Sequence, residues 1–286
     1  MPGMCPQQVM SFGKRFISGG FQVMKKIVSK SIHKKINLLA FFLIACLICS
    51  SCGLEDLSGE GYRIRDVVDG DTAELATGQK IRYLGVDTPE IMKKFSGNWI
   101  FDPEPLALEA KAFNRALVSG RRVDLEFDEK RVDKYGRWLV YVIVNGKLAN
   151  AELLREGYAY LMVYPPNDKY LEELLQAQSK AKNAKLGLWK EMRTIPPEEA
   201  HRYAGRLVTL KCKIQEVTSS RRAAVLLKTG VTGLEVIIYG GNLKYFTDMP
   251  VSRYRGEELE ITGKIRKRNG LELVVYHPSQ IRVMSK

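Results

Sequence analysis

The chain has 286 residues, which is more than one average domain needs, so two domains are the simplest expectation. Hydrophobic residues make up 45% of the sequence, enough for globular cores, and the formal net charge is +13. A basic excess of this size points to a polyanionic partner, either nucleic acid or an anionic membrane surface. Only one of the five cysteines, Cys212, lies beyond residue 52, which excludes a disulfide framework in the folded body.

The positive charge is unevenly distributed along the chain. Residues 201–286 hold 16 Lys and Arg against 7 Asp and Glu, whereas residues 60–195 hold 22 against 21. The C-terminal third therefore carries the basic surface, and the middle of the chain keeps the acidic residues that a cation-binding enzyme would need.

The first residues have the pattern of an export signal. Basic residues from Met24 to Lys35 precede an apolar run from Leu38 to Cys49, which is typical of a secretory signal and shorter than the roughly 20 apolar residues of a bilayer-spanning helix. Ser50-Ser51-Cys52-Gly53 follows and resembles a bacterial lipoprotein cleavage site with Cys52 as the lipidated residue. We expect residues 1–53 to be a signal or lipoprotein segment and residues 54–60 a linker. The protein would then be exported and anchored by lipid to a bacterial membrane, or otherwise periplasmic or secreted.

Residues 61–195 alternate strand and helix patterns. Alternating polarity predicts strands at 62–68, 72–75, 80–86, 122–127 and 138–144. Apolar residues at helical spacing predict helices at 104–118, 149–156 and 168–185, with Gly157 ending the second. Ile195-Pro196-Pro197 interrupts these patterns and indicates a domain boundary. The fold class is mainly β with helices, or α+β.

Residues 201–286 return to strand patterns. Strands are predicted at 208–217, 223–228, 234–239, 258–267 and 271–276, with a short helix at 240–248 and a hairpin turn at Asn269-Gly270. Five short strands with a helix after the third indicate a second small OB-like β-barrel. Basic and aromatic side chains accompany these strands, as in barrels that bind single-stranded nucleic acid: Arg221, Arg222, Lys264, Arg266, Lys267, Arg268, Tyr239, Tyr245, Phe246 and Tyr276. The alternative is a solvated hairpin tip over core aromatics, with a structural or membrane-surface role.

Three separate segments supply a consistent set of chemical groups: residues 68–72, 81–90 and 133–137. Asp71 and Asp87 offer carboxylate oxygens at the ends of adjacent strands, and the backbone carbonyl of Thr88 can add a third ligand. Such hard oxygen ligands suit calcium, which tolerates irregular coordination and retained water. The three histidines of the chain are scattered, so the sequence gives no cluster for zinc.

The same segments contain groups suited to phosphate chemistry. Glu90 follows Pro89, which fixes the local backbone, and its carboxylate could take a proton from an attacking water. Arg82 and Arg137 come from different strands, and their planar guanidinium groups match phosphate oxygens and could stabilise a five-coordinate transition state. Taken singly, each segment is also consistent with an ordinary turn or strand edge.

In their order along the chain, these segments resemble the active site of the staphylococcal (micrococcal) nuclease family. The resemblance runs from about Tyr62 to Trp189 and includes Gly146–Asn150, Gly157–Ala159 and Tyr164–Asn167. It implies a nuclease-type five-stranded OB barrel with about three helices over residues 61–195, followed by an OB-fold-like nucleic-acid-binding domain over residues 201–286.

The resemblance also implies roles for the acidic residues. Asp71 and Asp87 would bind Ca²⁺ with help from the Thr88 carbonyl. Glu90 would be the general base or would orient the attacking water, and Asp69 would shape the site as a neighbouring carboxylate.

Among the remaining residues, the resemblance implies that Arg82 and Arg137 bind the scissile phosphate. Lys134 and Tyr135 would line the nucleotide pocket, and Tyr164 would contact substrate. There are two departures from the family prototype. Met162 replaces a tyrosine that contacts the terminal phosphate of the nucleotide, and the segment between Glu90 and Glu109 is about five residues longer.

The expected function is that of an exported calcium-dependent nuclease that hydrolyses DNA, RNA or both. By analogy with the family it would leave 3′-phosphates. The alternative is a catalytically silent nuclease-like protein that binds nucleic acid or a partner at the cell surface.

Overall fold

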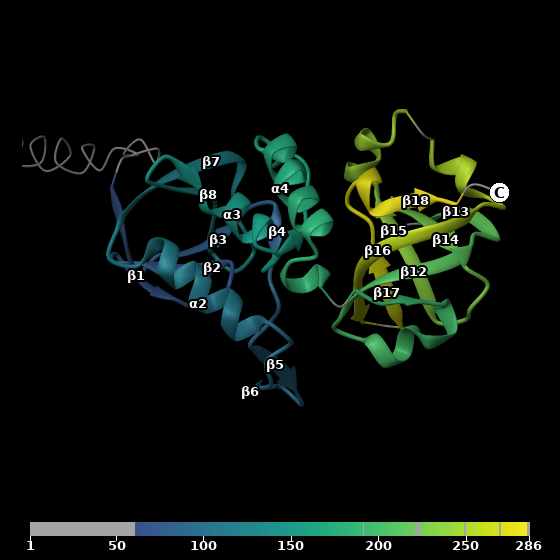
Figure 1. Cartoon of the computed structure of the whole chain (residues 1–286), viewed down its shortest axis with the longest axis horizontal. Helices are drawn as coiled ribbons and strands as arrows, with labels where there is room; N and C mark the ends of the chain where they lie inside the picture. Colours follow the sequence, from purple (N-terminus) through teal and green to yellow (C-terminus); the bar gives the residue numbers. More distant parts are fainter. Residues whose placement is uncertain (1–60, 191, 221–223, 249, 269, 285–286) are drawn as a thin grey trace, which may run out of the picture. The chain divides into compact units, whose positions relative to one another are not determined.

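The computed structural model describes residues 61–190, 192–220, 224–248, 250–268 and 270–284 (Figure 1). The expected signal segment 1–53, the linker 54–60 and the lipidation site Cys52 lie outside these residues, as do Arg221 and Arg222. Across the described ranges, no helix combines the length and the hydropathy that a bilayer crossing requires.

The first sheet closes into a barrel of five strands. These are β1 (Tyr62–Val67), β2 (Thr72–Leu75), β3 (Lys80–Tyr83), β7 (Arg122–Val132) and β8 (Trp138–Val144). They follow one another in the order β3-β2-β1-β7-β8, and a parallel pairing of β3 with β8 joins the two ends. The short β9 (Lys147–Leu148) extends the sheet beyond β8. The mixed α+β class with a five-stranded barrel is therefore confirmed.

The core of this barrel comes from the strand residues that point inward. Val67, Ile81, Leu125, Val140 and Val142 are all fully buried, and they come from β1, β3, β7 and β8. Side chains alternate between the two faces of a strand, and the first residues of β7 follow this pattern, with Val123 and Leu125 buried. Strand β8 also buries Tyr141, between Val140 and Val142. This alternation is the pattern that made the strands recognisable in the sequence.

Three helices accompany the barrel: α2 (Ala107–Val118), α3 (Ala149–Arg155) and α4 (Leu171–Ala184). The buried side chain of Asn150 links helix α3 to strand β8 and to the turn between β3 and β4. Its amide nitrogen donates to the Leu84 carbonyl at 2.8 Å, and its oxygen accepts from the Val142 backbone nitrogen at 3.0 Å. Gly157, just after this helix, has a φ of +76°, and a Cβ there would lie 2.4 Å from the Leu186 carbonyl oxygen. The predicted glycine stop is thus required both by the backbone conformation and by the lack of space.

Several element boundaries differ from the expected ones. The expected strand 80–86 is split into β3 and β4 (Val86–Asp87), and β7 runs five residues further than expected. A hairpin that the sequence patterns did not reveal joins β5 (Met92–Phe95) to β6 (Asn98–Phe101) within the longer segment after Glu90. Its Ser96-Gly97 turn has positive φ at both residues, 47° and 89°, which matches the twist of a two-residue hairpin.

A second sheet is built from residues 194–283. Its order is β11 (Thr194–Ile195), β12 (Leu207–Lys213), β16 (Glu258–Lys267), β17 (Leu271–Val274), β15 (Leu234–Tyr239), β14 (Ala224–Lys228) and β13 (Glu216–Ser220). In addition, β18 (Ile281–Val283) pairs with β16. Strands β12 and β13 are consecutive in the chain, but within the described residues they do not pair with each other. We call residues 194–283 the second barrel, after the fold that the sequence predicts for them.

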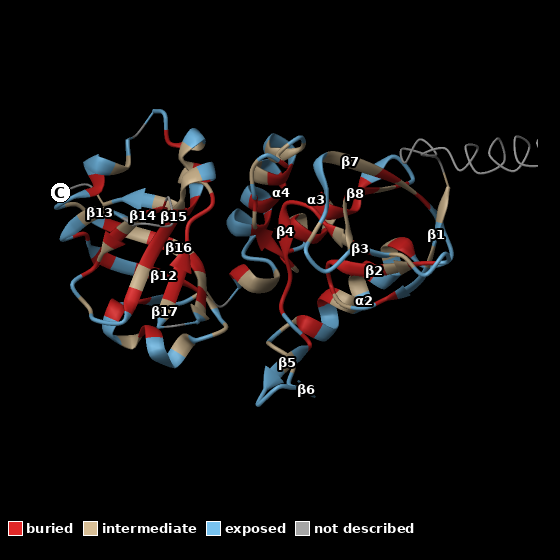
Figure 2. Ribbon diagram, turned by 180° about the vertical axis from the view of Figure 1, so that it is seen from behind, coloured by how far each residue is buried: buried red, intermediate tan, exposed pale blue. Residues whose placement is uncertain are grey.

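The second barrel has its own core, separate from that of the first. Figure 2 shows the buried residues running along β12 and β16, and Leu210, Val236, Ile261 and Leu273 are among those fully buried. The short helix expected after the third strand is a 3₁₀ helix, Gly240–Tyr245. The domain boundaries 61–195 and 201–286 and the OB-like identity of the second part stay predictions.

Candidate active site

The first acidic residues lie in the tight turn between β1 and β2. The Asp69 carboxylate accepts a hydrogen bond from the Asp71 backbone nitrogen at 3.1 Å, which fixes the turn. Gly70 lies between them, and a Cβ at this position would come within 2.7 Å of the Thr88 side chain. Glycine therefore lets Thr88 approach the turn. Thr88 donates to Asp71 Oδ2 from its backbone nitrogen at 2.8 Å and from its hydroxyl at 3.1 Å.

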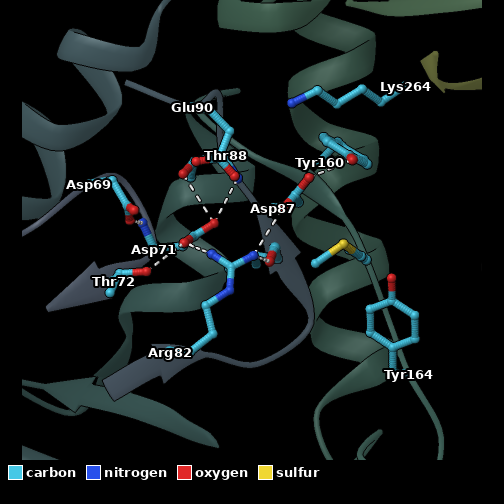
Figure 3. Close-up of polar contacts among 12 residues, drawn as sticks. Asp69, Asp71, Thr72, Arg82, Asp87, Thr88, Glu90, Tyr160, Tyr164 and Lys264 are labelled. Carbon is cyan, nitrogen blue, oxygen red and sulfur yellow. Dashed lines mark hydrogen bonds and ion pairs between the residues drawn. The ribbon is translucent and has the colours of Figure 1, made fainter. Parts of the chain in front are cut away.

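Asp87 and Arg82 complete the centre of the site. Asp87 lies on β4, which pairs with β10 (Tyr160–Leu161), and the Tyr160 hydroxyl donates to Asp87 Oδ2 at 2.6 Å. Arg82, on β3, lies with Nη2 at 2.9 Å from Asp87 Oδ1 and contacts Asp71 Oδ1 through Nη1. A single guanidinium thus bridges both carboxylates (Figure 3). The three side chains are at most 13% exposed, so these charges face one another in a largely dry site.

Glu90 lies beside this pair, and Figure 3 shows it on the same side of the cluster as Thr88. Its backbone is fixed by Glu104, whose carboxylate accepts from the Glu90 nitrogen at 3.1 Å and whose own nitrogen donates to the Glu90 carbonyl at 2.8 Å. The Glu90 side chain keeps solvent access, yet partial burial raises its pKa, and the charges of Asp69 and Asp87 raise it further. Burial likewise raises the pKa of Asp69.

Arg137 lies in the turn between β7 and β8, and Asp133 of the same turn holds its side chain. Its Nε donates to Asp133 Oδ2 at 2.8 Å, and its guanidinium carbon is 5.6 Å from the centre of the Tyr135 ring. Burial would raise the pKa of Asp133, but the hydrogen bonds from Arg137 outweigh it and hold that pKa below its usual range. The positive charge of Arg137 also acts on Asp69. It partly offsets the rise in the Asp69 pKa that burial causes.

The three residues expected to bind substrate form no hydrogen bond or ion pair with Asp71 or Asp87 in the described part of the chain. Tyr135 is 72% exposed, and the Lys134 ammonium is 4.9 Å from its ring centre. Tyr164 is 46% exposed, and its hydroxyl is 3.0 Å from that of Tyr276 in the second barrel. The structure therefore brings Asp71, Arg82, Asp87 and Thr88 into direct contact and leaves these three at the periphery.

Sequence patterns missed several groups that contact this cluster. Tyr160 and Glu104 each bond to a residue of the cluster, Asp87 and Glu90 respectively, and Arg266 of the second barrel lies 3.6 Å from Asp87. Tyr160 is separated from Asp87 by 73 positions. No local motif marks such a contact. In the sequence, Arg266 is distinguished only as one member of the basic run from Lys264 to Arg268.

The carboxylate pair fits a hard divalent cation. Asp71 and Asp87 are buried, and their carboxylates lie on either side of the same guanidinium group. Between residues 61 and 284, as far as the structure describes them, there is no group of three or more His, Cys, Asp or Glu side chains placed to bind a metal. Two carboxylates, a backbone carbonyl and water form a ligand set that calcium accepts and zinc does not favour.

Part of the chain is similar in sequence to known nucleases. A sequence model described as "Staphylococcal nuclease homologue" matches residues 80–191. The thermonuclease of Staphylococcus intermedius is 37% identical over 138 residues, covering 47% of this chain and 79% of that protein. The thermonuclease of Staphylococcus hyicus is 35% identical over 142 residues, covering 49% and 81%.

Endonuclease YncB of Bacillus subtilis (strain 168) is 41% identical over 129 residues, covering 43% of this chain and 59% of that protein. The segment matched by the family model, residues 80–191, includes β3, β4 and the turn between β7 and β8. The chain belongs to the staphylococcal nuclease family.

Proposed function

We propose that this protein is an exported, calcium-dependent nuclease that hydrolyses phosphodiester bonds in DNA, RNA or both. The observation that carries the proposal is the pair of buried carboxylates bridged by Arg82, with Glu90 beside them. Relatives named thermonuclease and endonuclease share this part of the chain, which supports phosphodiester hydrolysis and nucleic acid as the substrate.

Asp71 and Asp87, with the carbonyl of Thr88, would hold the calcium ion. When bound, the ion supplies a Lewis acid that polarises a nonbridging phosphate oxygen. The existing hydrogen bonds from Thr88 to Asp71 and from Tyr160 to Asp87 hold the two carboxylates in place. Such neighbouring donors orient metal-binding groups and thereby tune the site.

The remaining groups act on water and on the phosphate. Glu90 accepts a proton from a water molecule while the water oxygen attacks phosphorus in line. The bond from phosphorus to the 5′ oxygen breaks, the departing oxygen takes a proton from solvent, and a 3′-phosphate remains. Arg82 and Arg137 stabilise the additional negative charge of the transition state, because their planar groups donate two parallel hydrogen bonds to phosphate oxygens.

We also propose that residues 61–195 form the catalytic domain and residues 201–286 an OB-like domain that captures nucleic acid. The strand order of the second barrel and its excess of basic residues support this division. Export and a lipid anchor at Cys52 are proposed from the sequence pattern. Cell fractionation and labelling with a fatty-acid analogue would test them, and a Cys52→Ser variant that still takes up label would contradict the anchor.

The activity is tested by digesting defined single- and double-stranded DNA and RNA oligonucleotides with calcium, with other divalent ions and with EDTA. We expect cleavage with calcium, none with EDTA, and product ends whose mobility changes when a 3′-phosphatase is added. Binding without cleavage under every metal condition would instead support the silent binding protein. Cleavage that persists in EDTA would contradict the metal requirement.

A further inference from the structure

A guanidinium from the second barrel reaches the cluster of the candidate active site. Arg266 lies on β16, and its Nη2 is 3.6 Å from Asp87 Oδ2. The same nitrogen donates to the Tyr160 hydroxyl at 3.2 Å and contacts the Met162 sulfur at 3.2 Å. Tyr160 in turn donates to Asp87. A residue beyond the segment that matches the nuclease family therefore touches a carboxylate proposed to bind the metal.

Polar contacts hold the second barrel at this place. Lys264, two residues before Arg266 on β16, forms an ion pair of 2.6 Å with Glu104. Both side chains are at most 11% exposed, and Glu104 also accepts the backbone hydrogen of Glu90. Figure 3 shows Lys264 near Tyr160. Since breaking a buried ion pair leaves a charge without a partner, this contact favours a single arrangement.

Apolar packing and a buried amide support the same arrangement. Val163 of the nuclease part is buried in one cluster with Val274 and Tyr276 of the second barrel. The side chain of Asn242 donates to the carbonyls of Val163 at 3.0 Å and Tyr276 at 2.8 Å. The contact is therefore packed and hydrogen-bonded, and Arg266 is placed by more than its own interactions.

Arg266 keeps hydrogen-bonding capacity toward solvent. Its side chain is 25% exposed, and among the described residues only Nη2 has polar partners. Within the described residues, Trp189 Nε1 is the one fully buried side-chain polar atom without a partner, so Nε and Nη1 of Arg266 are not fully buried. These donors are thus accessible to an anion. A guanidinium with free donors beside a phosphodiester site is suited to a phosphate oxygen.

A groove near this contact shares Tyr160 with it, although Arg266 itself does not line the groove. It has a volume of about 610 Å³, and Pro89 and Tyr160 of the active-site region line it. Its cationic side chains are Lys190, Arg193, Arg206 and Lys264. Two acidic side chains also line it, and one of them is already neutralised by Lys264. The volume is that of a small-ligand site, which suits a few nucleotides of one strand.

We propose that Arg266 binds a substrate phosphate next to the scissile one, and that this groove carries the neighbouring nucleotides of a single strand. The second barrel thereby supplies part of the substrate site. The inference rests on the proposed nuclease function, which it extends to a substrate class and to a specific residue outside the nuclease part.

The first test is binding of a fluorescent thymidine dodecanucleotide in EDTA, measured by anisotropy at several salt concentrations. Arg266→Met should weaken binding on the order of tenfold, as expected for one charge-assisted hydrogen bond. The salt dependence of log K should become shallower by about 0.7, the value for one phosphate contact on a single strand.

The matched control is Arg282→Met, which removes the same charge from the second barrel. Arg282 lies on β18, its side chain is 69% exposed, and it pairs with Glu260. Binding by this variant should stay within about twofold of the wild type, because exposed pairs contribute little. Melting curves of both variants establish that they are folded. Arg266→Lys should bind between Arg266→Met and the wild type.

Cleavage in calcium provides the second readout. On the dodecanucleotide, Arg266→Met should raise KM about tenfold with kcat little changed. A contact to a phosphate that does not react stabilises the bound substrate and the transition state equally, so its loss raises KM alone. On a dinucleotide, which has a single phosphate, the loss of kcat/KM in the variant should be clearly smaller than on the dodecanucleotide. This length dependence separates a phosphate contact from general damage to the site.

Three results would overturn the inference. Arg266→Met could bind and cleave like the Arg282→Met control, it could lose activity equally on the dinucleotide, or it could cleave faster because Arg266 blocks the site. If Arg266→Met does not fold, the double variant Arg193→Met and Arg206→Met, exposed at both positions, must weaken binding in the same assay. A wild type that binds the strand through Arg266 yet never cleaves would refute the proposed function and leave this site standing.

Discussion

At the scale of single residues, the site is made by hydrogen bonds between segments that lie apart in the chain. Asp71 is held by Thr88, and Asp87 by Tyr160, so each carboxylate is oriented before any ligand binds. Arg82 occupies the space between them and offsets their charges. The types of residue at this site could be predicted from the sequence, because acidic and basic residues in turns after strands are visible in it. The partners that orient them could not, because they come from distant strands.

Replacing Glu90 with Gln should reduce kcat at least about a hundredfold, because the amide cannot accept the proton of the attacking water. Arg82→Ala should have an effect of similar size through loss of transition-state stabilisation. Steady-state cleavage of an oligonucleotide measures both. Glu156→Gln, at an exposed position after α3, is the control and should be unchanged. Wild-type rates in either site variant would show that the assigned role is wrong.

At the scale of elements, helices and strands were largely foreseeable, whereas their exact ends and one hairpin were not. The strands β2, β8, β15 and β16 begin and end as expected. Burial alternates along β16, whereas β2, β8 and β15 contain runs of consecutive buried residues. The β5–β6 hairpin escaped detection because it has no buried face: all four residues of β6 are exposed. Periodicity reports burial on one side, so an element that projects into solvent leaves no such pattern.

Asn150 should be among the most sensitive polar positions outside the site. Asn150→Ala should lower the free energy of unfolding by about 2–4 kcal/mol, since it leaves the Leu84 carbonyl and the Val142 nitrogen buried without partners. Chemical denaturation measures this change. Asn183→Ala, at an exposed position on α4, removes the same amide and should change stability by less than about 0.5 kcal/mol. Equal effects of the two substitutions would argue against the α3 contact.

The hairpin should be dispensable for stability. Phe95, Trp99 and Phe101 are each at least 66% exposed, so replacing all three with Ser should change the free energy of unfolding by less than about 1 kcal/mol. By contrast, Leu125→Ala in the fully buried core of β7 should lower it by about 2–5 kcal/mol. Thermal and urea unfolding compare the two. A large loss from the hairpin variant would mean that these side chains pack against the body.

At the scale of the whole molecule, the nuclease part and the second barrel contact each other through both polar and apolar side chains. The buried pair of Lys264 with Glu104 and the cluster around Val163 and Tyr276 connect them. The distribution of charge along the sequence predicted a basic C-terminal part. It did not predict that Arg266 of this part contacts Asp87 of the nuclease part. That contact depends on how two folded surfaces fit, which no local pattern encodes.

The thiol of Cys212 reports on whether the second barrel is intact. It is 7% exposed on β12, and burial raises its pKa to about 12. In a form containing residues 57–286, which has no other cysteine, the folded protein should react with a thiol reagent at pH 8 at least about a hundredfold more slowly than the denatured one. Colorimetric titration with and without denaturant measures the rates. Rapid reaction without denaturant would show that this part opens readily.

The order of three motifs carried the family resemblance, and the barrel strands, the three helices and the charged residues of the proposed site could be predicted from the sequence. These follow from local rules: alternation of polarity, helical spacing, glycine in turns, and charged residues in loops. Tertiary structure alone decided that Arg82 bridges Asp71 and Asp87, that Tyr160 and Glu104 orient the site, and that Arg266 joins it. The physical reason is that such contacts depend on strand pairing and surface complementarity between distant parts of the chain, and these arise only when the chain is folded.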